Sequence, residues 1–237
     1  MTRLALAFLL ALTVPAFAAA YDKTETTSAY TLRLRVPTEA MAIAPLKAEI
    51  FARFAHDSAE IKTDSVSDQK DIPEHFHAYA LDTLWRVTFN SPDVLSLSGY
   101  SFIDQNGAHP NAGYDSIVWD KSAQRAVAIN ELFAKDQLDP AFKAIATYAK
   151  AELIKFVSEQ EGAPADSSMA DEGIAPDPKK LGHYALTYAK GQTHANGIVL
   201  LYGAGEVWAH VLGDVKLSVP VSVFSKYLTP RWKAEFN

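Results

Sequence analysis

The 237-residue chain contains no cysteine. Disulfides therefore cannot hold the fold together, and a lipid-modified cysteine anchor is excluded. Thiolate nucleophiles and thiolate metal ligands are excluded for the same reason. The composition, 49% hydrophobic and 21% charged, is typical of a globular protein with a sizeable core. That core has to supply the stability that disulfides provide in many small secreted domains.

Long hydrophobic runs are absent after the first 20 residues. That first segment carries Arg3, a short apolar run, "LALAFLLALTVPAFA", and then small residues that suit cleavage after Ala18 or Ala20. We expect residues 1–20 to be a cleaved secretory signal peptide, with an uncleaved anchor as the alternative. The mature chain is then expected to be periplasmic or secreted in a bacterium, with no membrane span.

Positive charge is scarce, with 22 Lys and Arg against 28 Asp and Glu. Removal of the segment that contains Arg3 leaves 21 basic residues, so the mature charge is −7. Nucleic acid and anionic membrane surfaces are therefore poor partners, whereas a basic protein is electrostatically easier to bind. A modest acidic charge is also an ordinary means of staying soluble.

The first half of the mature chain predicts a strand, a helix and then a meander. Alternation predicts a strand over 29–36, and Pro45 begins a helical pattern that reaches Ile61. The polar stretch "DSVSDQKDIPE" predicts a loop. Alternating segments from Tyr79 to Phe89 and from Val94 to Ile103, with turns at "NSPD" and "KSAQR", predict an antiparallel meander of about four strands. A β-bulge at Gly99 would bring the side chains on either side of it to one face.

The second half predicts another helix and more strands. Asp139 and Pro140 begin a helical pattern that ends near Ser158. Residues 159–180 predict a long loop, three further strands follow, and a short helix comes after Pro220. We therefore predict an α+β fold in which two longer amphipathic helices pack on one face of a mainly antiparallel sheet, with a short C-terminal helix.

Histidines provide the candidates for chemistry. His75 and His77 would point the same way on a strand and could share a metal ion, with His109 or His183 as a third ligand. Because a HExxH motif is absent, solvent-facing histidines are the favoured interpretation, and no cofactor is expected.

The stretch "NGAHPNAGYDSIVWD" offers His109 and Asp115 as a catalytic base pair, with Asn111 nearby. A supporting nucleophile motif such as Gly-x-Ser-x-Gly is absent. The favoured interpretation is a structural turn in which His109 and Asn111 cap backbone groups.

The same stretch, continued as "GAHPNAGYDSIVWDKSAQRAVAINELF", resembles the hallmark of the DUF3298 domain family. "IVLLYGAGEVWAHVLGDVKLSVPVSVFSKYL" resembles the ending of that domain. The strand and helix between Tyr30 and Ser58 are similar to the DUF4163 region that often precedes it. The resemblance covers about residues 29–229, with Asn106 and Pro110 standing where glycines are usual.

The resemblance implies a DUF4163-like strand–helix region over 21–70 and a DUF3298-like domain over 71–237, together one compact unit. The family is found in the extracytoplasmic parts of lysozyme-sensing anti-sigma factors. A non-catalytic envelope module is therefore favoured, with a basic protein such as lysozyme or peptidoglycan fragments as ligand. His109, Asn111 and Asp115, and the acidic residues Asp166, Asp171 and Glu172 of the long loop, are the candidate binding residues.

Two alternatives stay open. The first is an envelope-polymer hydrolase that uses His109 and Asp115 with a bound metal ion or water. The second is a periplasmic domain that binds a small ligand in a deep apolar pocket.

Overall fold

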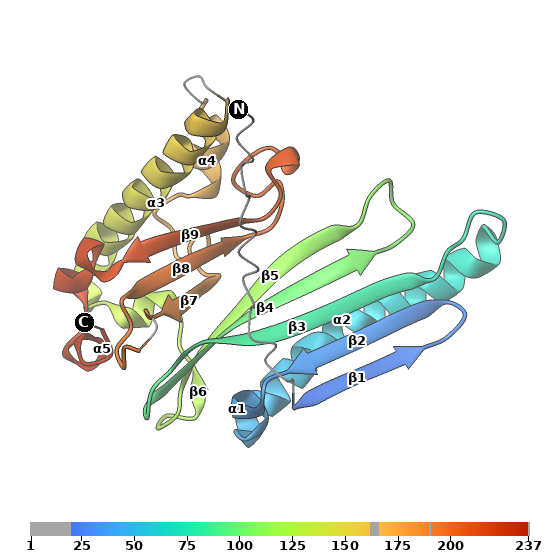
Figure 1. Ribbon diagram of the computed structural model, residues 1–237, viewed down its shortest axis with the longest axis horizontal. Coiled ribbons are helices and arrows are strands. Elements are labelled where there is room, and N and C mark those ends of the chain that lie inside the picture. The colour runs from blue at the N-terminus through green and yellow to red at the C-terminus, as the bar shows by residue number, and fades with distance from the viewer. Residues whose placement is uncertain (1–19, 162–165, 190, 237) are drawn as a thin grey trace, which may run out of the picture.

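The computed structural model describes residues 20–161, 166–189 and 191–236. The expected signal peptide lies outside these residues. The fold is α+β, as predicted, and it contains a mostly antiparallel six-stranded sheet, a three-stranded sheet and two long helices (Figure 1). Within the described ranges, no helix combines the length and apolarity that a membrane crossing requires.

The six-stranded sheet follows the chain order from β1 to β6. Its neighbours are antiparallel except β2 and β3, which are parallel. A parallel pair needs a crossover, and α1 (Thr38–Met41) and α2 (Ala44–Asp71) supply it. The predicted meander is confirmed in the last four strands. The strands are β1 (Tyr21–Thr26), β2 (Tyr30–Val36), β3 (Tyr79–Asn90), β4 (Val94–Asp104), β5 (Asn111–Asp120) and β6 (Arg125–Ala126).

Helix α2 covers one face of this sheet, behind β2 and β3 in Figure 1. Its buried Leu46 and Ile50 pack in one hydrophobic cluster with Leu97 of β4 and Ile117 of β5. The loop predicted over residues 64–74 is wrong for residues 64–71, because the helix continues to Asp71. Residues 64–71 are polar but stay helical, because Ser65 is buried and Asp68 accepts a hydrogen bond from Tyr79 Oη.

The bulge in the meander lies on β3 and not at Gly99. The register between β3 and β4 shifts between Val87 and Phe89, so Thr88 is the extra residue. Phe89 thereby leaves the α2 face and joins the core on the opposite side. Gly99 keeps its regular partners, and a Cβ there would lie 3.1 Å from the Trp85 ring. Its small size makes room for the tryptophan.

The three-stranded sheet contains β7 (Tyr184–Thr187), β8 (Gly197–Tyr202) and β9 (Val215–Pro220), all antiparallel. These strands were predicted. Helix α3 (Leu138–Glu161) packs on this sheet, so the two long helices cover different sheets (Figure 1). Short helices complete the fold: η1 (Ile129–Leu132), η2 (Lys135–Gln137), α4 (Ser168–Gly173), η3 (His210–Leu212), η4 (Val221–Val223), η5 (Ser225–Tyr227) and α5 (Pro230–Lys233).

The two sheets meet where β7 lies against β3, β4 and β5, on the face turned away from α2. Ser96 connects them, because its Oγ accepts 2.9 Å hydrogen bonds from Leu186 N of β7 and from Thr88 Oγ1. The regions 21–70 and 71–237 also share the larger sheet, since β2 pairs with β3. One hydrophobic core therefore extends from the end of the larger sheet through the smaller sheet to α3.

Candidate functional site

Two loops that are far apart in the sequence lie side by side. They are the β4–β5 turn, residues 105–110, and the β8–β9 connection, residues 203–214. The rings of His109 and His210 lie 4.6 Å apart between centroids, with their planes at 38°. A Cβ on Gly203 would lie 3.0 Å from Ala112 O, so the chains approach closely here. We name residues 105–110 and 203–214 the loop pair.

Several side chains of the loop pair pack on the core, whereas its tip is exposed to solvent. Val207 is buried, and the partly buried Trp208 and Leu212 pack against the main core. Gly213 adopts a φ of +72°, which a side chain would strain, and it turns the chain back into β9. Val211 is 95% exposed between these anchors. The exposed Val211 side chain is therefore accessible to a protein partner.

Tyr114 of β5 joins the loop pair to the larger sheet. Its hydroxyl donates a 3.2 Å hydrogen bond to Asp214 Oδ2, and Lys216 Nζ lies 5.1 Å from its ring centroid. Burial and the negative charge of Asp214 raise the pKa of Tyr114 above its ordinary value. The tyrosine therefore stays neutral and acts as a hydrogen-bond donor near the loops.

The structure does not bring His109 and Asp115 into contact. Asp115 Oδ1 accepts a 2.6 Å hydrogen bond from Arg53 Nη1 and another from Ser116 N, whereas His109 Nδ1 lies 3.3 Å from Pro110 O. Asn111, the first residue of β5, is exposed. A histidine that faces another histidine has no carboxylate to orient it as a base, so the geometry does not support the hydrolase alternative.

The other histidine candidates are also separated. His75 and His77 lie in the irregular segment before β3 and not on a strand. His77 Nε2 lies 2.9 Å from Asp104 Oδ1, and His183 belongs to the segment before β7. Across the described residues, no cluster of three or more His, Asp or Glu side chains could hold a metal ion.

The acidic candidates of the long loop are partly occupied. Asp171 Oδ1 accepts a 2.6 Å bond from Lys150 Nζ, and this contact lowers the pKa of Asp171. Asp166 Oδ1 accepts a hydrogen bond from Ser168 N at the start of α4, while Glu172 is exposed. Residues 162–165 of this predicted loop lie outside the described residues. The loop thus presents less free negative charge than its composition indicates.

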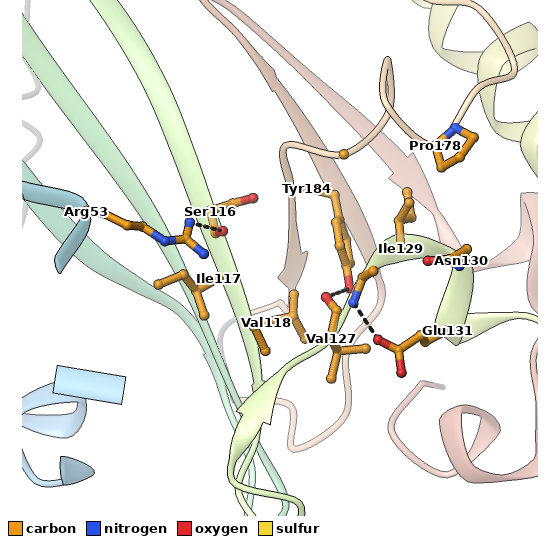
Figure 2. Close-up of a pocket in the computed structure, with 13 residues that line it drawn as sticks. Arg53, Ser116, Ile117, Val118, Val127, Ile129, Asn130, Glu131, Pro178 and Tyr184 are labelled. Carbon is orange, nitrogen blue, oxygen red and sulfur yellow. Dashed lines mark hydrogen bonds between the residues drawn. The ribbon is translucent and has the colours of Figure 1, made fainter. Parts of the chain in front are cut away.

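A pocket of about 310 Å³ lies between β5 and the segment that leads to β7 (Figure 2). Ile117, Val118 and Ile129 line its apolar part. Its main polar groups already have partners: Arg53 Nη1 donates to Ser116 O, and Glu131 Oε1 accepts from Ala128 N. With its polar groups engaged by the protein itself, the pocket offers little to orient a small ligand.

Arg53 of α2 bonds residues of β5 beside this pocket. Its guanidinium bonds both Glu49 and Asp115. Burial lowers the pKa of Arg53, but the two carboxylates raise it by more, so the guanidinium remains charged. Charged side chains over an edge strand also discourage another strand from pairing there.

Tyr184 closes the other side of the pocket, where its buried hydroxyl donates a 2.9 Å hydrogen bond to Val127 O (Figure 2). Replacing Tyr184 with Phe is expected to lower the free energy of unfolding by about 1–2 kcal/mol, because Val127 O is then left unsatisfied. Tyr188→Phe removes a half-exposed hydroxyl and should change stability by less than about 0.5 kcal/mol. Denaturant unfolding of both variants tests this, and equal effects would contradict it.

Several solved structures match this chain at the level of the fold, and two of them belong to one family. A DUF3298 family member from Bacteroides fragilis matches with a TM-score of 0.58 and 14% identity over 88% of this chain and 92% of that one. A DUF3298 family protein from Pseudomonas aeruginosa matches with a TM-score of 0.58 and 13% identity over 90% and 93%. The chain has the DUF3298 fold. No family model and no curated protein matches the sequence.

In this fold, the two segments that resemble the DUF3298 motifs lie next to each other in space. Both segments that carried the resemblance contribute to the loop pair, "GAHPNAGY" through His109 and "YGAGEVWAHVLG" through His210. Sequence reasoning identified His109 but missed Arg53, His210 and Val211. Exposed apolar residues have no periodic signal, and an ion pair between residues 62 positions apart leaves no local pattern.

Proposed function

We propose that the chain is a DUF3298-family protein exported to the bacterial envelope, where it binds a protein partner without catalysing a reaction. The loop pair is the recognition surface, and a basic protein of the lysozyme kind is the preferred partner. The observation that carries this proposal is the anchored loop that holds Val211 outward beside His109 and His210. Apolar anchors at the centre of a polar rim contribute much of the binding energy in protein interfaces.

The charge of the protein supports a basic partner. The expected mature charge is −7, and exposed acids lie along α2. Burial raises the pKa of Asp57, while His56 and Arg53 lower it and Asp115 and Glu60 raise it. The net negative charge of the protein attracts a basic protein and accelerates their association, an effect that salt weakens. The loop pair then determines how tightly the partner is held.

Val211→Asp is expected to weaken the binding of lysozyme by residues 21–237 at least about tenfold, because a charge replaces the apolar anchor. Val66→Asp is the matched control, since Val66 is also exposed, at 56%, and lies on α2. Both variants add the same negative charge, so only the position differs. Titration calorimetry at two salt concentrations measures the affinities, with muramidase activity followed in parallel.

Three results would discard this function. The first is absence of lysozyme binding at micromolar protein, and the second is equal weakening by both valine substitutions. The third is hydrolytic activity on envelope polymers that disappears in His109→Ala.

A further inference from the structure

The larger sheet has a second face that α2 does not cover. In Figure 1 this face points toward the viewer, with α2 behind the strands. Strand β7 covers only the end near Ser96, where Leu186 N donates to Ser96 Oγ. Beyond that end, Tyr100 is partly exposed and Phe102 is 38% exposed. We name this uncovered part of β3, β4 and β5 the open face.

A leucine and two tyrosines lie side by side across the open face. Leu84 of β3 pairs in register with Tyr100 of β4, and Tyr100 pairs with Tyr114 of β5. The two tyrosine rings lie 5.3 Å apart between centroids. Phe102 stands two residues farther along β4 on the same side, because side chains alternate along a strand. Asp214 and Lys216 lie against Tyr114 at one end of the row, whereas Tyr100 and Phe102 keep part of their surface exposed.

A free cation lies at one end of the row. Arg86 of β3 is exposed on the same face, and within the described part of the chain its guanidinium has no ion pair and no hydrogen bond. The two arginines on the same side of the neighbouring strand β2 already have partners, since Arg33 bonds Asp22 and Arg35 bonds Asp82. Arg86 also lies near enough to Tyr114 to oppose the rise of its pKa that burial and Asp214 cause. Arg86 is thus available for an external anion.

These features favour a particular class of ligand. A pyranose ring presents C–H groups that pack on aromatic rings, and its hydroxyls pair with polar side chains such as the nearby Ser98. A guanidinium binds a carboxylate through two parallel hydrogen bonds. A nucleic acid would also stack on such rings, but it carries a charge on every nucleotide and the expected protein charge is −7.

We propose that the open face binds a glycan chain that bears a carboxylate. Its sugar rings stack on Tyr100 and Phe102, and its carboxylate pairs with Arg86. The open face borders the loop pair, because Tyr114 donates a hydrogen bond to Asp214. Its recognition chemistry is different, and this proposal does not depend on a protein partner binding at Val211. A sheet face suits an extended ligand, because successive strands present side chains at a regular spacing.

Two tetrasaccharides of equal length test the proposal with residues 21–237. One alternates N-acetylglucosamine with N-acetylmuramic acid, which carries a carboxylate, and the other contains only N-acetylglucosamine. We expect the first to bind at least about tenfold more tightly in titration calorimetry. Arg86→Gln should remove this preference, whereas Phe102→Ala should weaken the binding of both sugars. Arg33→Gln is the matched control, because that arginine is already paired, and it should preserve the preference.

Failure is also well defined. Binding of neither tetrasaccharide at about 1 mM overturns the proposal, and so does an unchanged preference in Arg86→Gln. Polyglutamate that binds as tightly as the acidic sugar, in a manner that needs Arg86 but not Phe102, would assign the face to acidic polypeptides instead. Circular dichroism confirms the fold of each variant, and Phe102 is exposed enough that its replacement should leave the core intact. Lysozyme binding by the same variants separates this result from the proposed function.

Discussion

Phe224→Ala is expected to lower the free energy of unfolding by about 3–5 kcal/mol, the usual cost of removing a fully buried phenylalanine. Phe224 is completely buried, and its ring meets Phe133 and Phe236 edge-on at centroid distances of 6.1 and 5.4 Å. The ring lies between η4 and η5, where the C-terminal segment closes over the main core. Loss of the ring leaves a cavity between the segments that contain Phe133, Phe224 and Phe236.

The measurement is thermal or denaturant unfolding of residues 21–237. For a domain of this size we expect the midpoint temperature to fall by roughly 2–4 °C for each kcal/mol lost. Phe156→Ala is the matched control, because Phe156 on α3 is half exposed and its removal opens no cavity. If the two alanine variants unfolded at the same temperature, the C-terminal segment would not be part of the core.

Gly197→Ala is expected to cost about 2 kcal/mol or more, because it forces a steric clash between two paired strands. A Cβ on Gly197 would lie 2.4 Å from Val219 O and 3.1 Å from Pro220 Cα. Both are backbone atoms of β9, and they cannot move aside without breaking the pairing with β8. The substitution adds only one methyl group, so the clash is its main effect.

Gly113→Ala provides the control within a strand. No atom lies within 4 Å of a Cβ at Gly113, so the alanine variant should be as stable as the parent or slightly more stable. Urea unfolding of the two variants compares them directly. Similar midpoints would mean that β8 and β9 are not as close as the structure places them.

The strands of the larger sheet were predictable from sequence, but the position of the β-bulge was not. Alternation correctly identified β3 and β4 as strands. It placed the irregularity at Gly99, because glycine is a frequent bulge residue, whereas the structure has it at Thr88. The decisive factor is tertiary: Phe89 has to turn toward β7, and Trp85 needs the space above Gly99.

The helix pattern failed for a related reason. The stretch from Asp64 to Asp71 has the polarity of a loop, yet it forms the last turns of α2. Only a few inward positions have to pack at the end of a helix that lies on a sheet face, and Ser65 and Asp68 meet this need without being apolar. Local composition cannot reveal that the partner, Tyr79, stands on the next strand.

The sequence by itself determined the α+β class, most strands, both long helices and the DUF3298 resemblance, because periodicity and turn residues are local properties. Tertiary structure alone decided the division into two sheets, the separation of His109 from Asp115 and the meeting of His109 with His210. It also decided that Arg53 bonds two carboxylates, whereas Arg86 has no ion pair among the residues that the structure describes. Contacts between distant residues depend on how sheets twist and pack, so no stretch of sequence records them.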